Sequence, residues 1–265
     1  MTEQTTGIAP HSTPTPWTNV RFQPSVALGL VVYAGYLAIF YATWAINNVD
    51  YDTIGDTVES TKLHYAMPTL LGCAFLVVAI SVLGWWRITL FDTFRSGPKW
   101  AWIGPIAMFL LACASFAGVT WGNASSSLLV WSVLGAIGVG FGEEMITRGA
   151  LLVGLRTHHN EVVAWFFSTL AFAALHAPNA LFGQSVGKTA TQLVFTFIVG
   201  SLLWSIRRLS GTLILCMFLH GFWDSAAFLP GATGDDAFPG AVLIYLIGIV
   251  CAIGVLRKNR GIFVR

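Results

Sequence analysis

Three ionisable side chains interrupt a long apolar run in this chain. The run reaches from about Ser127 to Leu155, and its segment 142–149 reads Gly-Glu-Glu-Met-Ile-Thr-Arg-Gly. If the run crosses a bilayer, each charge costs at least ~2.5 kcal/mol on insertion scales. Charged residues kept at that depth usually serve a function, so the sequence predicts that Glu143 and Glu144 belong to a functional site.

Helical spacing separates the two carboxylates. At ~100° per residue, Glu144 and Arg148 lie four positions apart on one face and can form an ion pair, whereas Glu143 points elsewhere. A buried pair that only joins two helices would explain one carboxylate and leave the other without a partner. We therefore interpret Glu144 and Arg148 as a supporting pair and Glu143 as the carboxylate available for chemistry.

Two further apolar runs carry polar residues one helical turn apart. Phe172 lies four positions before His176, and His220 lies four positions before Asp224, so each pair shares a helix face. A lone His in such a helix is more often a packing residue, but polar residues in membrane spans tend to face the interior and find partners. We expect both His residues and Asp224 to meet Glu143 near the middle of the membrane.

These residue types are suited to two chemistries, and both end in hydrolysis of an acyl bond. In the first, Glu143 is the general base for a water held with His176, while His220 and Asp224 stabilise an oxyanion. In the second, Glu143, His176 and His220 hold a divalent metal such as zinc, which acidifies the water. No cofactor is certain from the residues alone. The chain has no HExxH or GxxxxGK[ST] motif, and its one GxSxG match, at residues 183–187, lies between two predicted membrane helices rather than after a strand, so soluble-type zinc peptidases, serine hydrolases and P-loop proteins have no support.

Composition indicates that the main solvent of this protein is lipid. Of its 265 residues, 55% are hydrophobic and 10% are charged, and the mean hydropathy is +0.71. The net charge of +2 argues against a nucleic-acid partner. The four cysteines lie in apolar runs without metal-ligand spacing and are interpreted as packing residues.

The hydrophobic pattern predicts an all-α fold: a polytopic bundle of about eight transmembrane helices. Since a span needs ~20 apolar residues, the expected spans are 25–46, 66–85, 101–120, 127–154, 162–178, 189–205, 211–229 and 239–256. With the N-terminus in the cytosol, eleven Lys and Arg residues fall on the cytosolic side and only Lys62 and Lys188 on the other. Both termini are therefore predicted to be cytosolic, and the acidic loop from Asp50 to Glu59 is predicted to be an external, solvated connector.

The chain divides into three parts on this basis. Residues 1–24 are polar and rich in Thr and Pro, and we expect a disordered cytosolic tail. Residues 25–256 form the transmembrane domain. Residues 257–265 form a basic cytosolic tail that is interpreted as a membrane-surface anchor. We expect an integral, multi-pass protein of the cell membrane, and the sequence indicates no oligomeric state.

Three motifs in this order resemble those of the CPBP family of intramembrane proteases, which includes the CAAX prenyl endopeptidases and bacteriocin-processing and abortive-infection relatives. The family's EExxxR is similar to Glu143–Arg148, its FxxxH to Phe172–His176, and its HxxxN/D to His220–Asp224. The motifs cover about 80 residues, and the predicted bundle of eight spans also resembles the family's membrane domain.

The resemblance implies peptide-bond hydrolysis within the membrane. Glu143 and His176 would activate water, His220 and residue 224 would form the oxyanion site, and Glu144 and Arg148 would support them. The family more often has Asn at the last position, and Asp can donate a hydrogen bond only when protonated. We hypothesise instead that ionised Asp224 orients His220 and stabilises it as a cationic oxyanion donor.

The expected partners are the lipid bilayer and a membrane-associated, in some cases lipidated, polypeptide substrate. The main alternative is a scaffold or immunity protein of the same fold that holds a partner without cutting it. The insertion cost of an intact set of charges favours catalysis over that alternative. An ion pathway lined by Glu143, Glu144 and Asp224 would fit the charges but not the motif spacing.

Overall fold

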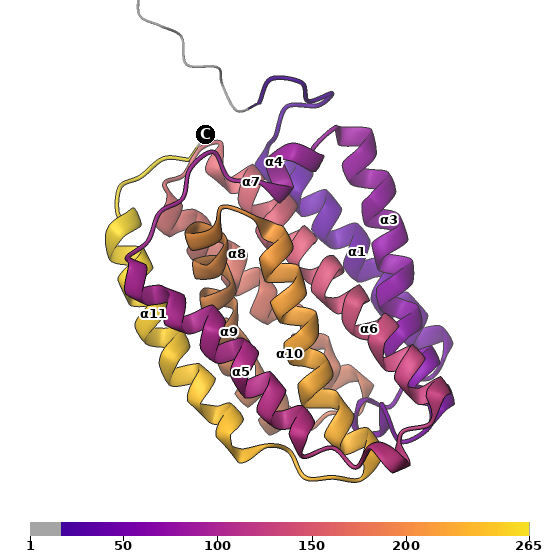
Figure 1. The fold of residues 1–265 in the computed structure, drawn as a ribbon. Helices are drawn as coiled ribbons and strands as arrows, with labels where there is room; N and C mark the ends of the chain where they lie inside the picture. The colour runs from indigo at the N-terminus through magenta and orange to yellow at the C-terminus, as the bar shows by residue number, and fades with distance from the viewer. Residues whose placement is uncertain (1–16, 265) are drawn as a thin grey trace, which may run out of the picture.

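The computed structural model describes residues 17–264 of the chain. Within this part, eight helical segments are long and apolar enough to cross a membrane, and they stand side by side in one bundle (Figure 1). The segments are Val26–Ile46, Val58–Leu83, Lys99–Ala117, Ser126–Arg156, Glu161–Phe182, Val186–Ser210, Leu213–Thr233 and Pro239–Asn259. The predicted all-α bundle of eight spans is therefore confirmed.

Several spans combine more than one helical element. The first is α1 (Val26–Ile46), and the second joins α2 (Val58–Ser60), the π-helical η2 (Thr61–Ala66) and α3 (Met67–Leu83). The third joins η3 (Lys99–Trp102) and α5 (Ile103–Ala117), and the fourth joins α6 (Ser126–Glu144), the π-helical η5 (Met145–Leu151) and α7 (Leu152–Arg156). The remaining spans are α8 (Glu161–Ala174) with η6 (Ala177–Phe182), then α9 (Val186–Ser210), α10 (Leu213–Thr233), and η7 (Pro239–Val242) with α11 (Leu243–Asn259). The short helices η1 (Tyr51–Thr53), α4 (Trp86–Leu90) and η4 (Trp121–Asn123) lie in the connections.

Capping residues explain where the observed spans differ from the predicted ones. The second span begins at Val58 rather than at 66 because Thr57 and Ser60 form a capping box, in which Ser60 N donates to Thr57 Oγ1 at 3.0 Å. The sixth span is also longer than predicted. It begins after Ser185, whose hydroxyl caps α9, and it ends at Gly211, which has a φ of 76°. Hydropathy locates the apolar middle of a span, whereas the caps fix its ends.

The described part of the predicted N-terminal tail, residues 17–24, packs against the bundle. Residues 1–16 lie outside the described residues. In the rest of that tail, Arg21 N donates to Leu83 O at 3.1 Å, and Trp85 Nε1 donates to Phe22 O at 2.8 Å. The described part of the chain thus enters α1 along a defined path.

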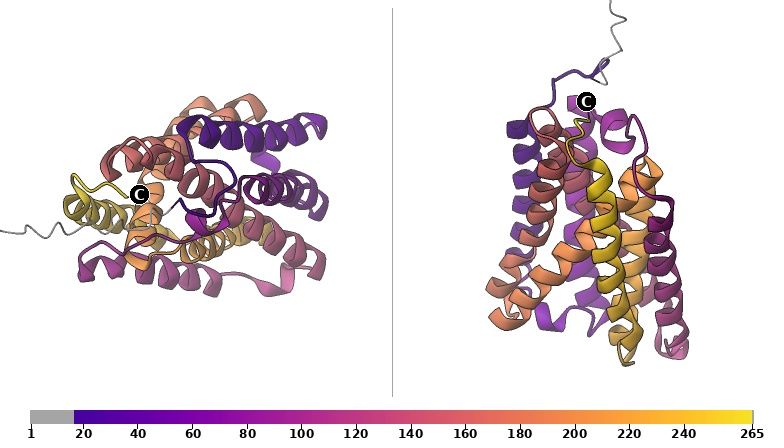
Figure 2. Two further views of the ribbon diagram at one scale, coloured as in Figure 1. Left: turned by 90° about the horizontal axis from the view of Figure 1, so that it is seen from above. Right: turned by 90° about the vertical axis from the view of Figure 1, so that its left-hand side faces the viewer.

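The predicted boundary between the last span and the C-terminal tail falls inside a helix. Helix α11 continues to Asn259, whose side-chain amide donates to Val255 O at 2.8 Å and accepts from Arg208 Nε at 3.2 Å. Both ends of the described chain lie at the same end of the bundle (Figures 1 and 2), as an even number of spans requires. The cytosolic assignment of that end remains a prediction.

That end of the bundle contains a buried ion-pair network around Asp92, in the connection between α4 and η3. The Asp92 carboxylate accepts from Arg156 Nη1 at 2.8 Å and from Arg207 Nε at 2.9 Å, and it also pairs with Arg208. Burial by itself raises the pKa of the Asp92 carboxyl, but these three guanidinium groups hold that pKa well below its usual range. From the sequence, these three arginines were predicted to lie in loops, whereas in the structure they have a structural role. Through Asp92 they connect α7 and α9 to the segment that follows α4.

Replacing Asp92 with Asn should destabilise the protein by about 3 to 5 kcal/mol, because it leaves buried arginines without their shared counter-ion. A lower unfolding temperature in detergent at neutral pH would show this effect. Asp56→Asn is the matched control, since Asp56 is exposed. Equal unfolding temperatures for the two variants would contradict the structural role of Asp92.

Two glycines allow α6 and α10 to touch along their backbones. A Cβ on Gly140 would lie 2.3 Å from Met217 O, and a Cβ on Gly221 would lie 2.5 Å from Ala136 O. Neither position can hold a side chain unless the helices separate. This close approach brings the end of α6, with its two carboxylates, against the middle of α10, with His220 and Asp224.

Candidate active site

The two neighbouring carboxylates at the end of α6 are both buried and point to different surroundings. Glu143 is 7% exposed and Glu144 is fully buried. The helix widens into the π-helical η5 directly after them, a feature that often marks functional positions. Within η5, the Thr147 hydroxyl donates to the Glu143 carbonyl at 2.5 Å and so keeps this turn closed.

Glu144 connects two of the three sequence motifs. Arg148 Nη1 lies 2.9 Å from Glu144 Oε1, so the ion pair expected from the spacing is present. The same oxygen lies 3.1 Å from Nδ1 of His220 on α10. That second contact was not predicted, and it means that Glu144 supports a histidine as well as an arginine.

Phe172 on α8 lies between the charged side chains. The guanidinium carbon of Arg148 lies 3.8 Å from the centre of its ring, a cation–π contact. The rings of His176 and His220 meet the same ring edge-on, at centroid distances of 5.8 and 5.4 Å. The aromatic position of the second motif therefore separates the two histidines and covers the arginine.

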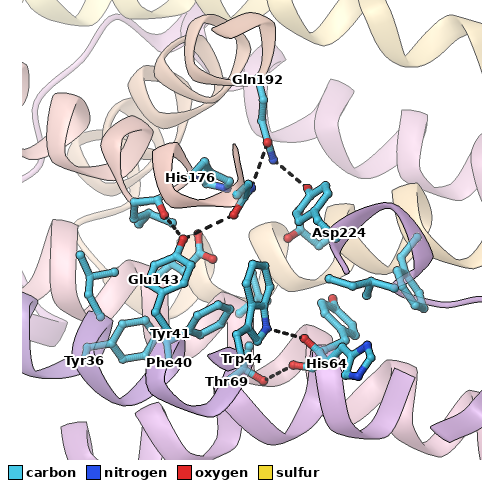
Figure 3. A pocket seen from close by; sticks show the side chains of 18 residues that line it. Tyr36, Phe40, Tyr41, Trp44, His64, Thr69, Glu143, His176, Gln192 and Asp224 are labelled. Carbon is cyan, nitrogen blue, oxygen red and sulfur yellow. Dashed lines mark hydrogen bonds between the residues drawn. The ribbon is translucent and has the colours of Figure 1, made fainter. Parts of the chain in front are cut away.

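A cavity of about 260 Å³ lies beside these residues (Figure 3). Glu143, His176 and Asp224 are on its wall, and Oε2 of Glu143 is buried without a hydrogen-bond partner. Much of the remaining wall is aromatic: Tyr36, Phe40, Tyr41, Trp44, Tyr51, Tyr65 and Phe228. The cavity thus combines an available carboxylate and a histidine with apolar surroundings.

A second, more open groove of about 860 Å³ lies on the other side of His176 and Asp224. His220 lines this groove rather than the cavity, and its Nε2 lies 3.7 Å from Asp224 Oδ2. The cavity and the groove adjoin at residues that line both, so the four predicted residues lie around two adjoining spaces. Glu143 faces the cavity, His220 faces the groove, and His176 and Asp224 line both.

A chain of polar side chains at the border of the two spaces was missed by the sequence reasoning. Asn179 Nδ2 donates to Gln192 Oε1 at 3.1 Å, and Gln192 Nε2 donates to the Tyr51 hydroxyl at 3.0 Å. Tyr41 donates to Leu175 O, next to His176. Burial raises the pKa of the Tyr51 hydroxyl, which keeps this phenol neutral. Uncharged polar residues inside predicted spans, such as Gln192, were the available signal.

The metal-binding alternative does not fit the side-chain arrangement. Within residues 17–264, no group of three or more His, Cys, Asp or Glu side chains is placed to hold a metal ion. Of the predicted ligand set, His220 has Nδ1 at 3.1 Å from Glu144 Oε1 and Nε2 at 3.7 Å from Asp224 Oδ2, so both ring nitrogens face carboxylates other than Glu143. No step of the mechanism is therefore derived through a metal.

The fold and the site define a class of protein: a polytopic membrane protein with carboxylate and histidine side chains at a cavity inside the bundle. Residues 124–226, which contain all three motifs, match the family model described as type II CAAX prenyl endopeptidase Rce1-like. The resemblance to the CPBP family of proteases is confirmed by this match, and at the level of the family it implies protease activity. No curated protein and no solved structure matches the chain.

Proposed function

We propose that this protein is an intramembrane endopeptidase that hydrolyses a peptide bond in a membrane-associated polypeptide, with the CAAX-type chemistry of its family. One observation carries the proposal. The buried Oε2 of Glu143 has no partner and lies on a cavity wall with His176, inside the segment that matches the endopeptidase family. A carboxylate kept in this state has a large insertion cost and no structural contact to offset it.

Water activation is assigned to Glu143 with His176. Nδ1 of His176 lies 3.2 Å from the Phe172 carbonyl, which can only accept, so Nδ1 carries the proton. Nε2 of neutral His176 therefore keeps its lone pair and can accept a hydrogen bond from a water in the cavity. Glu143 takes a proton from that water as its oxygen attacks the scissile carbonyl carbon, and it later gives the proton to the leaving amine.

Oxyanion stabilisation is assigned to His220. Glu144 accepts a hydrogen bond from Nδ1 of His220, which leaves Nε2 directed toward the groove and Asp224. With carboxylates on both sides, the imidazolium form is stabilised, and Nε2–H can donate to the tetrahedral intermediate. Glu144 and Asp224 thus share the task of orienting His220, which the sequence argument had assigned to Asp224.

The role of Asp224 is tested by two substitutions. Asp224→Asn should retain activity, because a neutral amide can itself donate to the oxyanion, whereas Asp224→Ala should lose most of it. Peptidase assays on equal amounts of folded protein would compare the two variants. Equal losses in both would overturn this assignment.

The substrate can be found by comparing the membrane proteomes of cells that carry the wild-type protein or Glu143→Ala. An uncut precursor that accumulates only with the variant would identify the substrate and show whether it is lipidated. An unchanged proteome, together with an unchanged phenotype, would instead support the scaffold alternative. We place the protein in the cell membrane, and fractionation of the same cells tests that assignment.

A further inference from the structure

The two ends of the bundle differ in charge. At the end that holds both described termini, the exposed charged residues before α1, around α4 and η3, and at the end of α11 are basic: Arg21, Arg87, Arg95, Lys99, Arg257, Lys258 and Arg260. At the other end lie Lys62 and Lys188 together with the acidic residues Asp50, Asp52, Asp56, Glu59, Asp235 and Asp236. Because cytoplasmic loops collect Lys and Arg, the first end is expected in the cytosol and the acidic end on the opposite side.

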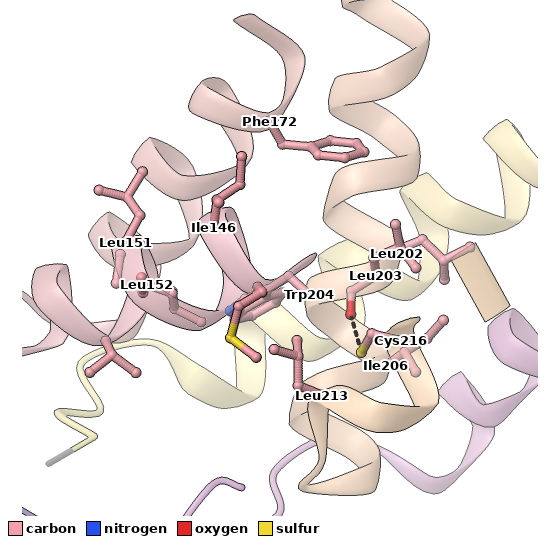
Figure 4. Packing of buried hydrophobic residues seen from close by; sticks show 14 of the residues in the cluster. Ile146, Leu151, Leu152, Phe172, Leu202, Leu203, Trp204, Ile206, Leu213 and Cys216 are labelled. Carbon is pink, nitrogen blue, oxygen red and sulfur yellow. Dashed lines mark hydrogen bonds between the residues drawn. The ribbon is translucent and has the colours of Figure 1, made fainter. Parts of the chain in front are cut away.

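The path from the site to the basic end is filled with side chains. Residues 199–210 of α9 are all buried, and Leu202, Leu203 and Trp204 belong to the same buried hydrophobic cluster as Ile146 and Leu213 (Figure 4). Beyond this layer lies the Asp92 network, which is also buried. Arg207 joins the two layers, because it pairs with Asp92 and donates to the carbonyl of Arg148.

The groove reaches the acidic end instead. Its lining runs from His220 and Val199 along the first half of α9 to Lys188 in the first turn of that helix and Gln184 in the loop before it. Lys188 is well exposed, at 64% of its side chain, and pairs at 3.1 Å with Asp52 in the α1–α2 connection. The groove and the exposed acidic end are therefore continuous at Lys188.

We propose that the substrate enters the site from the non-cytosolic side of the membrane. This inference rests on the proposed peptidase function and narrows its substrate class. The cut polypeptide is an exported or membrane-anchored chain whose scissile segment lies in the non-cytosolic half of the bilayer or beyond it. A segment presented from the cytosol has no open path to His176 and His220.

Cysteine labelling tests the direction of access. Single variants Lys188→Cys, Asp236→Cys and Arg260→Cys are placed in sealed membrane vesicles of known orientation and treated with a membrane-impermeant maleimide before and after permeabilisation. The wild-type protein gives the background from the four native cysteines. We expect the first two variants to react from the non-cytosolic side and Arg260→Cys only from the cytosolic side. The reverse pattern would overturn the proposal.

A pair of variants on α9 tests whether the groove itself is open to water from that side. Thr196 lines the groove, whereas Val194 lies nearer the start of the helix and is exposed outside it, where lipid would cover it. We expect Thr196→Cys to react at least tenfold faster than Val194→Cys from the non-cytosolic side. Faster reaction of Thr196→Cys from the cytosolic side would contradict the inference.

The outcome can be separated from that of the proposed function. Labelling needs no activity, so the same pattern is expected when Glu143→Gln is added to each variant. If the cysteines are labelled in the expected pattern but no substrate is cut, the proposed peptidase function is wrong and the proposed access path is supported. If a substrate is found and its cut lies in a cytosolic segment, the access path fails while the function stands.

Discussion

Glu143→Gln should leave a folded protein whose peptidase activity is lower by a factor of about 10² to 10⁴, the usual contribution of a positioned general base. Glu143 Oε2 has no hydrogen-bond partner in the described structure, so the amide breaks no contact of that atom. Removing a charge from the membrane interior can even raise stability. Both quantities would be measured on the same detergent-purified sample. We expect the peptidase activity to fall and the unfolding temperature to stay at the wild-type value.

The matched control for this variant is Glu59→Gln, which changes an exposed carboxylate that does not line the cavity. We expect that control to retain both activity and stability. If Glu143→Gln kept wild-type activity, Glu143 would not be the base. If it unfolded, the carboxylate would have a structural role that its missing contacts do not indicate.

Glu144→Gln should damage folding as well as activity. Glu144 Oε1 lies 2.9 Å from Arg148 Nη1 and 3.1 Å from His220 Nδ1, and all three groups are buried. Loss of the carboxylate charge strands the Arg148 guanidinium, which costs about 3 to 5 kcal/mol in comparable buried pairs. It also removes the contact that orients His220, so the fraction that folds should be less active.

The yield of folded protein and its unfolding temperature separate this variant from Glu143→Gln. We expect Glu144→Gln to give less folded protein and a lower unfolding temperature. Similar yields and equal losses of activity in the two variants would mean that the roles of the two carboxylates have been divided wrongly.

Features with a local physical cause could be predicted from the sequence. The eight spans follow from apolar runs of bilayer length, and the Glu144–Arg148 pair follows from a spacing of four on one helix. The position of Phe172 on the face of His176 was predicted in the same way. The ends of the spans were predicted less accurately, because single capping residues such as Thr57 and Gly211 determine where a helix begins or ends.

Features that depend on contacts between distant parts of the chain could not be predicted. His220 meets Glu144 across a separation of 76 residues, through an approach of α6 and α10 that Gly140 and Gly221 permit. The cavity and the groove arise from the whole bundle, so the motifs carried no signal that Glu143 would line one and His220 the other. The Asp92 network likewise brings together residues from three separate parts of the chain. From the sequence, each of these charged residues was predicted to lie in a loop, with no sign that they meet.

The central claim is that this protein cuts a polypeptide with Glu143 as the base. The most direct test uses the precursor that accumulates in cells carrying Glu143→Ala, incubated in lipid vesicles with purified wild-type protein or with Glu143→Gln. We expect the wild-type protein to convert the precursor to a product cut at one peptide bond, and Glu143→Gln to do so at least a hundredfold more slowly. Cutting at equal rates by both proteins, or a precursor that the pure wild-type protein leaves intact, would contradict it.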